Sequence, residues 1–224
     1  MRVVPAGSKG MMALKKKITE TKTFQGFRKM YHVLASSLFP LAYLYPPFGL
    51  TLPQTHDWLL IVAGSCFTVS FLFDLLRLKN HQFNSQFMQF FSAFIRRTEV
   101  DKFNGSTFLC LAFFAVILLF PRPLAIAAMF FLSLGDAAAE LSGKNFGRIR
   151  IFQKSLEGSL GFFFVAFVTA WMLFFDWKVA LLGGLAAALV ELFSFELDDN
   201  LTVPLGSATA MWLVVTLLHW GVTV

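Results

Sequence analysis

Residues 133–163 read SLGDAAAELSGKNFGRIRIFQKSLEGSLGFF, and this stretch crowds charges and glycines between two apolar segments. Asp136 and Glu140 stand on an otherwise apolar helical segment. A carboxylate there costs roughly 2.5–3.5 kcal/mol near the centre of a membrane span, and less near an end of the span. Ionisable groups in such places commonly serve a function, so we expect the chemistry of the protein to lie in this stretch.

The composition around this stretch is that of a membrane protein. The chain has 224 residues, 57% of them hydrophobic, and several apolar runs reach the roughly 20 residues that cross a bilayer. We therefore predict an all-α, polytopic integral membrane protein with about seven transmembrane helices. The predicted spans are residues 33–52, 57–76, 107–121, 123–141, 160–176, 178–195 and 204–223.

The basic residues predict the orientation of these spans. Of the 19 Lys and Arg residues, eight precede the first span, five lie in 77–106 and four in 142–159. Short basic loops stay on the cytoplasmic side, so we expect a cytoplasmic N-terminus and a C-terminus outside. The net charge of +6 then lines one membrane face, where anionic headgroups or an anionic cofactor are simpler partners than nucleic acid.

Three segments describe the predicted organisation. Residues 1–32 form a basic cytoplasmic N-terminal segment, and residues 33–224 form a single transmembrane catalytic domain. Within it, phenylalanines recur at three- and four-residue spacing over residues 81–97, which predicts an amphipathic helix in the membrane interface. This helix is either a lipid-side wall of a substrate entrance or a connector that anchors the bundle.

Asp136 and Glu140 are four residues apart, so a helix places both carboxylates on one face. Paired carboxylate oxygens suit Mg²⁺, with the alanines between them leaving room for a ligand to approach. The alternative is an ion pair with a neighbouring Lys or Arg, or close helix packing through the alanines.

The predicted loop at 142–159 has the composition of a phosphate site. Glycines allow close backbone approach, cations attract negative charge, and serines stand near the start of the next helix, whose free amides favour anions. The alternative is a basic loop that only follows the positive-inside bias. The candidate phosphate-binding residues here are Gly143, Lys144, Gly147, Arg148, Lys154, Ser155, Gly158 and Ser159.

Two further clusters fall on the same predicted membrane face. Asp198, Asp199 and Asn200 lie in an inner loop that breaks the basic pattern, and we interpret them as metal ligands opposite the basic loop, or as an exposed turn. Arg28 and Lys29 precede the first span and either meet a phosphate or form a basic collar. Together the clusters predict a nucleotide with Mg²⁺ at the inner surface and a lipid arriving sideways from the bilayer.

The motifs LGDAAAELSGKNFGR, KSLEGSLGFF and ELDDNLTVPL, with RKMYH ahead of the first span, resemble those of the CTP-dependent lipid kinases, the family of dolichol, phytol and diacylglycerol kinases. The resemblance covers about residues 28–206. It implies transfer of the γ-phosphate of CTP to the hydroxyl of a membrane lipid. The positions that match the family's motifs are Arg28, Lys29, Asp136, Gly143, Lys154, Ser155 and Asp198–Asn200.

Within this resemblance, we expect Asp136 to orient the lipid hydroxyl, Lys154 to act on the phosphates, and Asp198 and Asp199 to carry the metal. The reverse assignment of the carboxylates fits the sequence equally well. Glu140 departs from the family, which has a small residue there, so its role as a ligand rests on helical spacing alone.

Two alternative functions use the same charges. A phosphatidate cytidylyltransferase also uses CTP and has a similar K[ST]-x-EG element, but attacks the α-phosphate. A non-enzymatic lipid transporter would place its charges nearer the bilayer midplane. The sequence does not identify the acceptor lipid or the oligomeric state, and CTP rather than ATP follows only from the resemblance.

Overall fold

The protein is built almost wholly of helices in a computed structural model that describes residues 22–91, 99–152, 154–193 and 198–217. The all-α prediction is therefore confirmed, with one two-stranded hairpin added to it. The elements are α2 (Lys22–Leu44), η1 (Pro47–Gly49), α3 (Leu52–Lys79), α4 (His81–Phe91), α5 (Gly105–Leu119), α6 (Arg122–Phe130), the π-helical turn η3 (Phe131–Gly135), α7 (Asp136–Phe146), β1 (Arg150–Ile151), β2 (Lys154–Ser155), α8 (Leu156–Phe174), α9 (Trp177–Leu192) and α10 (Asp199–Leu217).

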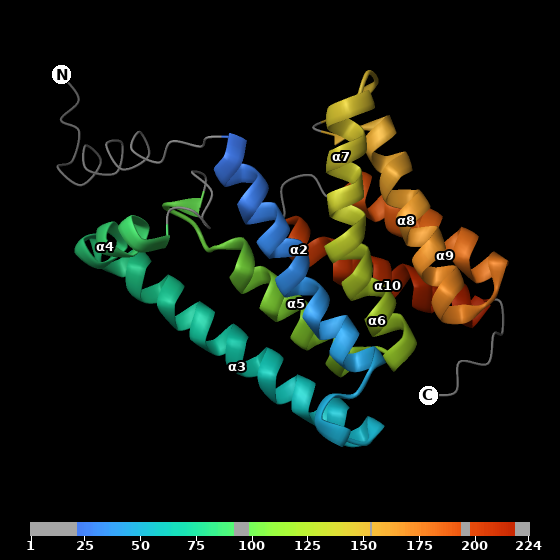
Figure 1. The fold of residues 1–224 in the computed structure, drawn as a ribbon, viewed down its shortest axis with the longest axis horizontal. Coiled ribbons are helices and arrows are strands. Elements are labelled where there is room, and N and C mark those ends of the chain that lie inside the picture. Colours follow the sequence, from blue (N-terminus) through green and yellow to red (C-terminus); the bar gives the residue numbers. More distant parts are fainter. Residues whose placement is uncertain (1–21, 92–98, 153, 194–197, 218–224) are drawn as a thin grey trace.

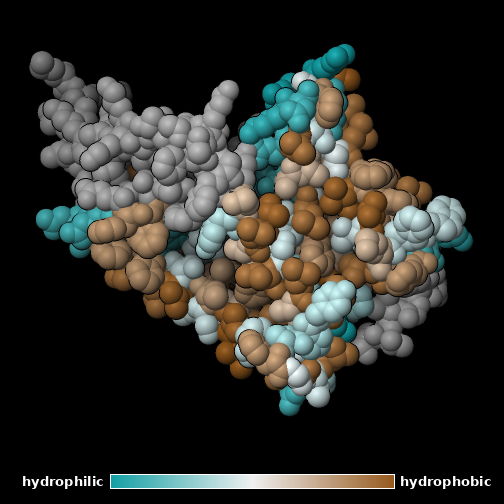
Figure 2. Space-filling view, viewed as in Figure 1, coloured by the Kyte–Doolittle hydropathy of each residue, from teal (hydrophilic) through white to brown (hydrophobic). Residues whose placement is uncertain are grey.

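Four helical segments of the described residues are long and apolar enough to cross a membrane: Leu52–Lys79, Arg122–Phe146, Leu156–Phe174 and Asp199–Leu217. The first of them, α3, is strongly apolar although few of its residues are buried in the protein. Figure 2 shows hydrophobic surface over much of the visible face of the molecule and hydrophilic surface at the free end of α7. Such apolar surface is stable in hydrocarbon, which supports an integral membrane protein.

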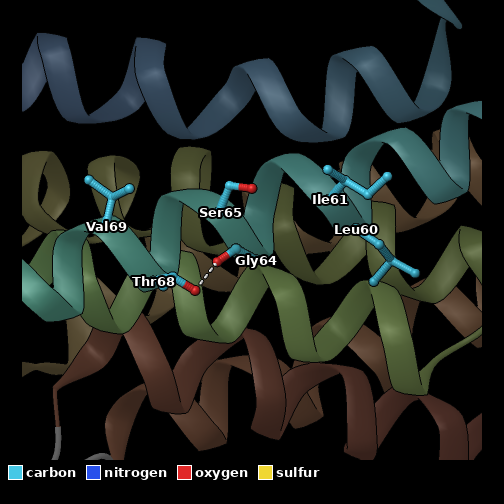
Figure 3. Close-up of a pocket in the computed structure, with 6 residues that line it drawn as sticks. All are labelled: Leu60, Ile61, Gly64, Ser65, Thr68 and Val69. Carbon is cyan, nitrogen blue, oxygen red and sulfur yellow. Dashed lines mark hydrogen bonds between the residues drawn. The ribbon is translucent and has the colours of Figure 1, made fainter.

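The hydroxyl groups on exposed helix faces are consistent with this environment. A shallow groove along α3 is lined by Leu60, Ile61, Gly64, Ser65, Thr68 and Val69. In Figure 3 the Thr68 hydroxyl points back to its own helix, where it donates to the carbonyl of Gly64 at 2.8 Å. Thr209 and Thr216 of α10 make the same bond one turn back. A hydroxyl satisfied by its own backbone can face lipid at little cost.

Prolines move the first helix from its predicted position. The predicted span 33–52 ends early, because α2 stops at Leu44, just before Pro46 and Pro47. Neither proline can donate a backbone hydrogen bond, and the residue before a proline is disfavoured in helical conformation. At its other end α2 starts earlier than predicted. It begins at Lys22, inside the segment 1–32 that we predicted to be separate from the transmembrane domain.

The helix that carries Asp136 is longer than predicted. α6, η3 and α7 continue one another from Arg122 to Phe146, whereas the predicted span was 123–141. Gly143 and Lys144 therefore lie on a helix, and the prediction that they belong to a loop over 142–159 is wrong. The connection is shorter because no residue before Gly147 interrupts helical geometry, and Gly147 with its extended backbone ends the helix.

Figure 1 shows α3 with α4 on one flank of the molecule and α7, α8 and α9 on the other. α10 joins the two flanks, because it contacts α5 on one side and α9 on the other. At the far end from the hairpin, the Arg122 side chain donates to the carbonyl oxygens of Tyr43 at 2.6 Å and Leu44 at 3.2 Å. This contact satisfies carbonyls that the end of α2 would otherwise leave unpaired.

Close packing of α7 on α8 depends on glycine. A Cβ added at Gly161 would lie 2.7 Å from the Cβ of Ser142 and 3.0 Å from the carbonyl oxygen of Ala138. A Cβ at Gly135 would lie 2.7 Å from the ring of Phe162. The backbones can approach this closely only because these positions carry no side chain.

We expect Gly161→Val to destabilise the protein by about 1–3 kcal/mol, because the new side chain forces α7 away from α8. Thermal unfolding in detergent measures the loss. Leu160→Ala is the matched control, since Leu160 is an exposed neighbour on the same helix. Equal melting temperatures for Gly161→Val and the unmodified protein would contradict this account of the packing.

Candidate functional site

The basic connection between α7 and α8 is an ordered hairpin. β1 pairs antiparallel with β2, with Arg150 opposite Ser155 and Ile151 opposite Lys154. The Glu157 carboxylate accepts hydrogen bonds from the backbone N–H groups of Arg148 at 3.0 Å and Ile149 at 3.2 Å. These bonds hold the residues just before β1 against the first turn of α8.

Ser155 is the N-cap of α8, and the predicted glycines gather around it. Its hydroxyl oxygen accepts from the backbone N–H of Gly158 at 3.1 Å, which is the usual way a serine satisfies a free amide at a helix start. A Cβ added at Gly143 would lie 2.8 Å from this oxygen, and one at Gly147 3.1 Å from it. Four predicted phosphate-site residues, Gly143, Gly147, Ser155 and Gly158, are thus close neighbours.

The Lys154 ammonium is the centre of the polar contacts. It lies 2.8 Å from Oε1 of Glu191, 2.5 Å from the backbone oxygen of Glu191 and 3.4 Å from Oδ1 of Asp199. The Lys154 side chain is 21% exposed and that of Glu191 only 6%. Residues from β2, α9 and α10 therefore meet at one cation. This cation joins the predicted basic loop, residues 142–159, to the acidic segment, residues Asp198–Asn200.

Glu191 is a site residue that our sequence analysis missed. It lies near the end of α9, and its second carboxylate oxygen accepts from the hydroxyl of the predicted residue Ser159 at 3.1 Å. The signal was visible, because a single carboxylate in an apolar membrane helix is costly and calls for a partner. Glu191 lies inside an otherwise uninterrupted apolar run, which hydropathy alone assigns to a membrane span.

The acidic segment is folded back on itself at the start of α10. Oδ1 of Asp198 accepts from the backbone N–H of Asn200 at 2.9 Å and from its side-chain amide at 2.7 Å. Asn200 is buried, whereas Asp199 is partly exposed and reaches Lys154. The interpretation of this segment as a merely exposed turn is therefore wrong for Asn200.

Asp136 and Glu140 occupy successive turns of α7, as the spacing predicts. Glu140 forms an ion pair with Lys144 one turn further on, which is the alternative left open for it by the sequence. Asp136 is half-buried at the point where η3 passes into α7. π-helical turns within α-helices are frequent at functional sites, and η3 contacts α2, α8 and α10.

The early basic pair lies on α2, which runs antiparallel to the helix of Asp136. The two helices meet at Tyr43 and Arg122. Lys29 precedes Tyr43 by fourteen residues, and Asp136 follows Arg122 by fourteen, so the two backbones lie at a similar level along the helices, and α2 contacts η3 just before Asp136. The side chains of Arg28 and Lys29 lie outside the described residues.

Among the described residues, no three or more His, Cys, Asp or Glu side chains form a group that could hold a metal ion. Mg²⁺ needs no such cage, because it usually takes one or two carboxylates and completes its shell with water and substrate phosphates. Asp198 and Asp199 supply oxygen donors of that kind at the start of α10, and Asp136 carries another on α7. The donor set therefore fits Mg²⁺ held together with a nucleotide.

Comparison with known proteins finds relatives along most of the chain. An uncharacterised protein of Rickettsia prowazekii is 29% identical over 84% of this chain and 93% of its own length. The CTP-dependent diacylglycerol kinase 1 of Saccharomyces cerevisiae is also 29% identical, over 84% of this chain and 72% of its own length. A probable chloroplastic phytol kinase 3 of Glycine max is 36% identical over 42% of this chain and 35% of its own length.

No family model and no solved structure matches the chain. The named relatives indicate a membrane phosphotransferase with an alcohol group as acceptor. More narrowly, they support the family that the motifs predicted, the CTP-dependent lipid kinases.

We expect Glu191→Ala to lower the unfolding free energy by about 3 kcal/mol, because it leaves the Lys154 ammonium in a largely buried place with one strong partner fewer. The double variant Lys154→Met/Glu191→Leu removes both charges and should regain most of this stability, as measured by thermal unfolding in detergent. No recovery in the double variant would mean that Glu191 stabilises the protein by some means other than the ion pair.

Proposed function

We propose that the protein transfers the γ-phosphate of CTP to the hydroxyl of a membrane lipid, with diacylglycerol as the favoured acceptor. The observation that carries this proposal is the meeting of Lys154 with Asp199, since it joins the predicted phosphate-binding segment to the predicted metal-binding segment. The relatives named as CTP-dependent diacylglycerol kinases support both CTP and this acceptor.

We place the active site at the cytoplasmic membrane face, with about seven helices crossing the bilayer, the N-terminus cytoplasmic and the C-terminus outside. Seven helices in the described part of the chain support this count when α6, η3 and α7 are taken as one and the short α4 is left aside. Arg122 and Lys178 begin helices at the end opposite the hairpin, as the positive-inside prediction requires. α4 then lies in the interface, although residues 92–97 of the predicted helix 81–97 lie outside the described residues.

The proposed nucleotide site uses the hairpin end of the bundle. Lys154 and Arg148, with Lys144 on the last turn of α7, supply positive charge for a triphosphate, and the first turn of α8 supplies backbone amides. Gly143 and Gly147 let the Ser155 hydroxyl and the first turn of α8 lie close against the end of α7. Arg28 and Lys29 would add charge from the α2 side.

The proposed chemistry asks mainly for positioning and charge neutralisation. Asp136 accepts a hydrogen bond from the lipid hydroxyl and takes its proton as the oxygen attacks the γ-phosphorus, while CDP leaves. Bound Mg²⁺ would neutralise phosphate charge, held by Asp199 and Asp198 with Asn200 beside them. Ser159 and Glu191 keep Lys154 in place, and the pairing of Glu140 with Lys144 leaves Glu140 only a secondary part.

We expect label from γ-labelled CTP, and not from α-labelled CTP, to enter lipid when the purified protein meets Mg²⁺ and mixed micelles of diacylglycerol, polyprenol and phytol. Asp136→Asn should lower the rate by roughly 10²–10⁴-fold, the usual worth of a positioned base. Glu140→Gln is the matched control on the same helix and should stay within about threefold. Chromatography of the labelled lipid identifies the acceptor.

The label also separates the alternatives. Transfer of α label would make the protein a cytidylyltransferase, and movement of lipid across a proteoliposome membrane without nucleotide would favour a transporter. Equal loss of rate in Asp136→Asn and Glu140→Gln would contradict the role given to Asp136.

We further expect chelation of divalent cations to abolish transfer and added Mg²⁺ to restore it. Asp199→Asn should raise the Mg²⁺ concentration for half-maximal rate by about tenfold, because it removes a full negative charge from the proposed ion site. A Mg²⁺ titration at saturating CTP measures this shift. An unchanged midpoint would place the metal elsewhere.

A further inference from the structure

A buried charged network joins the end of α3 to the start of α5, and none of its members enters the proposed chemistry. The Arg77 and Asp74 side chains are both fully buried, with Arg77 Nε 2.6 Å from Oδ1 of Asp74. The rest of the guanidinium donates to the loop before α5, and it also stacks over the ring of Phe87. Its acceptors there are the carbonyl oxygens of Glu99, Val100 and Lys102 and the side-chain oxygen of Asn104.

Asp74 fixes the same loop from its other oxygen. Oδ2 accepts from the backbone N–H of Asn104 at 2.9 Å and from the Thr107 hydroxyl at 2.7 Å. An arginine has five N–H donors, and here five acceptors receive them. Such complete pairing holds the loop and the first turn of α5 in one arrangement.

The network reaches the acidic segment through the first residue of α5. The Gly105 backbone N–H donates to Oε1 of Glu99 at 3.1 Å. A Cβ added at Gly105 would lie 2.6 Å from the side-chain nitrogen of Asn200 and 3.2 Å from the same Glu99 oxygen. The buried Asn200 amide therefore packs against backbone that Arg77 and Asp74 hold in place.

An arginine at the end of a membrane helix has a less costly option. It can extend its side chain to the interface and leave the charge in water. Arg77 is instead fully buried with a carboxylate, an arrangement that often stabilises a protein no better than apolar residues would. Such a pair can instead contribute order, because it restricts the positions of the groups that it binds.

We infer that the Asp74–Arg77 pair positions the acidic segment: it holds the start of α5 against Asn200, and Asn200 holds Asp198. The pair acts through other residues and is a positioning device, not part of the catalytic groups. Its consequence for nucleotide affinity rests on the proposed function, whereas its effect on the order of α10 does not.

Two measurements on the full-length protein in nanodiscs test this inference. The first is amide hydrogen exchange over the first turn of α10, and the second is a set of KM values for CTP and for diacylglycerol. Arg77→Lys keeps the charge but cannot reach all five acceptors, and Thr107→Val removes one Asp74 contact in case Arg77→Lys does not fold. Thr107→Ser keeps the hydroxyl and should behave as the unmodified protein does. Leu59→Ala, on α3 with Arg77, controls for general loss of stability.

We expect exchange at the start of α10 to quicken by about tenfold in Arg77→Lys and by less in Thr107→Val. KM for CTP should rise about fivefold while KM for diacylglycerol stays within about twofold. Unchanged exchange at α10, or an equal change in Leu59→Ala, overturns the inference. Absence of γ-phosphate transfer by the unmodified protein would defeat the proposed function instead, and hydrogen exchange would still decide whether the pair orders α10.

Discussion

The candidate site depends on the need to pair the Lys154 ammonium at the end of a membrane bundle. A cation with little access to water is stable only beside negative charge, and Lys154 has Glu191 at 2.8 Å and Asp199 at 3.4 Å. Each partner belongs to a different helix, so the hairpin, the end of α9 and the start of α10 must all meet there. The end of α9 and the start of α10 therefore lie where the predicted phosphate-binding residues gather.

The second constraint is the space that small residues leave. Ser155 can cap α8 and still lie beside α7 only because Gly143, Gly147 and Gly158 carry no side chains. Side chains at these positions would push α7 and the hairpin apart. Glycine at these positions lets the backbones approach closely. The same close approach places backbone amides near a serine, and a phosphate favours such an environment.

The sequence predicted the helical membrane fold better than it predicted helix ends, and some of the site residues that it singled out lie close together, Gly143 and Gly147 with Ser155 and Lys154 with Asp199. Apolar length and the positions of charges were sufficient for the first, because both follow directly from hydrophobic transfer energy. The start of α2 and the extension of α7 to Phe146 could not be read from hydropathy, since Lys22 and Lys144 are polar residues that helices accept at their ends. Glu191 is visible in the sequence as a lone carboxylate in an apolar segment, but its partners in space leave no mark in a hydropathy pattern, and neither do those of the Asp74–Arg77 pair.

The acidic segment is held from two sides that are distant in sequence. Asp199 pairs with Lys154, which lies on the α8–α9 flank. Asn200 lies against Gly105, which lies on the α3–α5 flank. α10 contacts α5 on one flank and α9 on the other, so its first turn is where a shift in either flank would be felt. Phosphoryl transfer depends on positioning to a fraction of an ångström. A metal-binding segment placed at this junction would have the order that such a reaction needs, because both flanks of the bundle hold it in place.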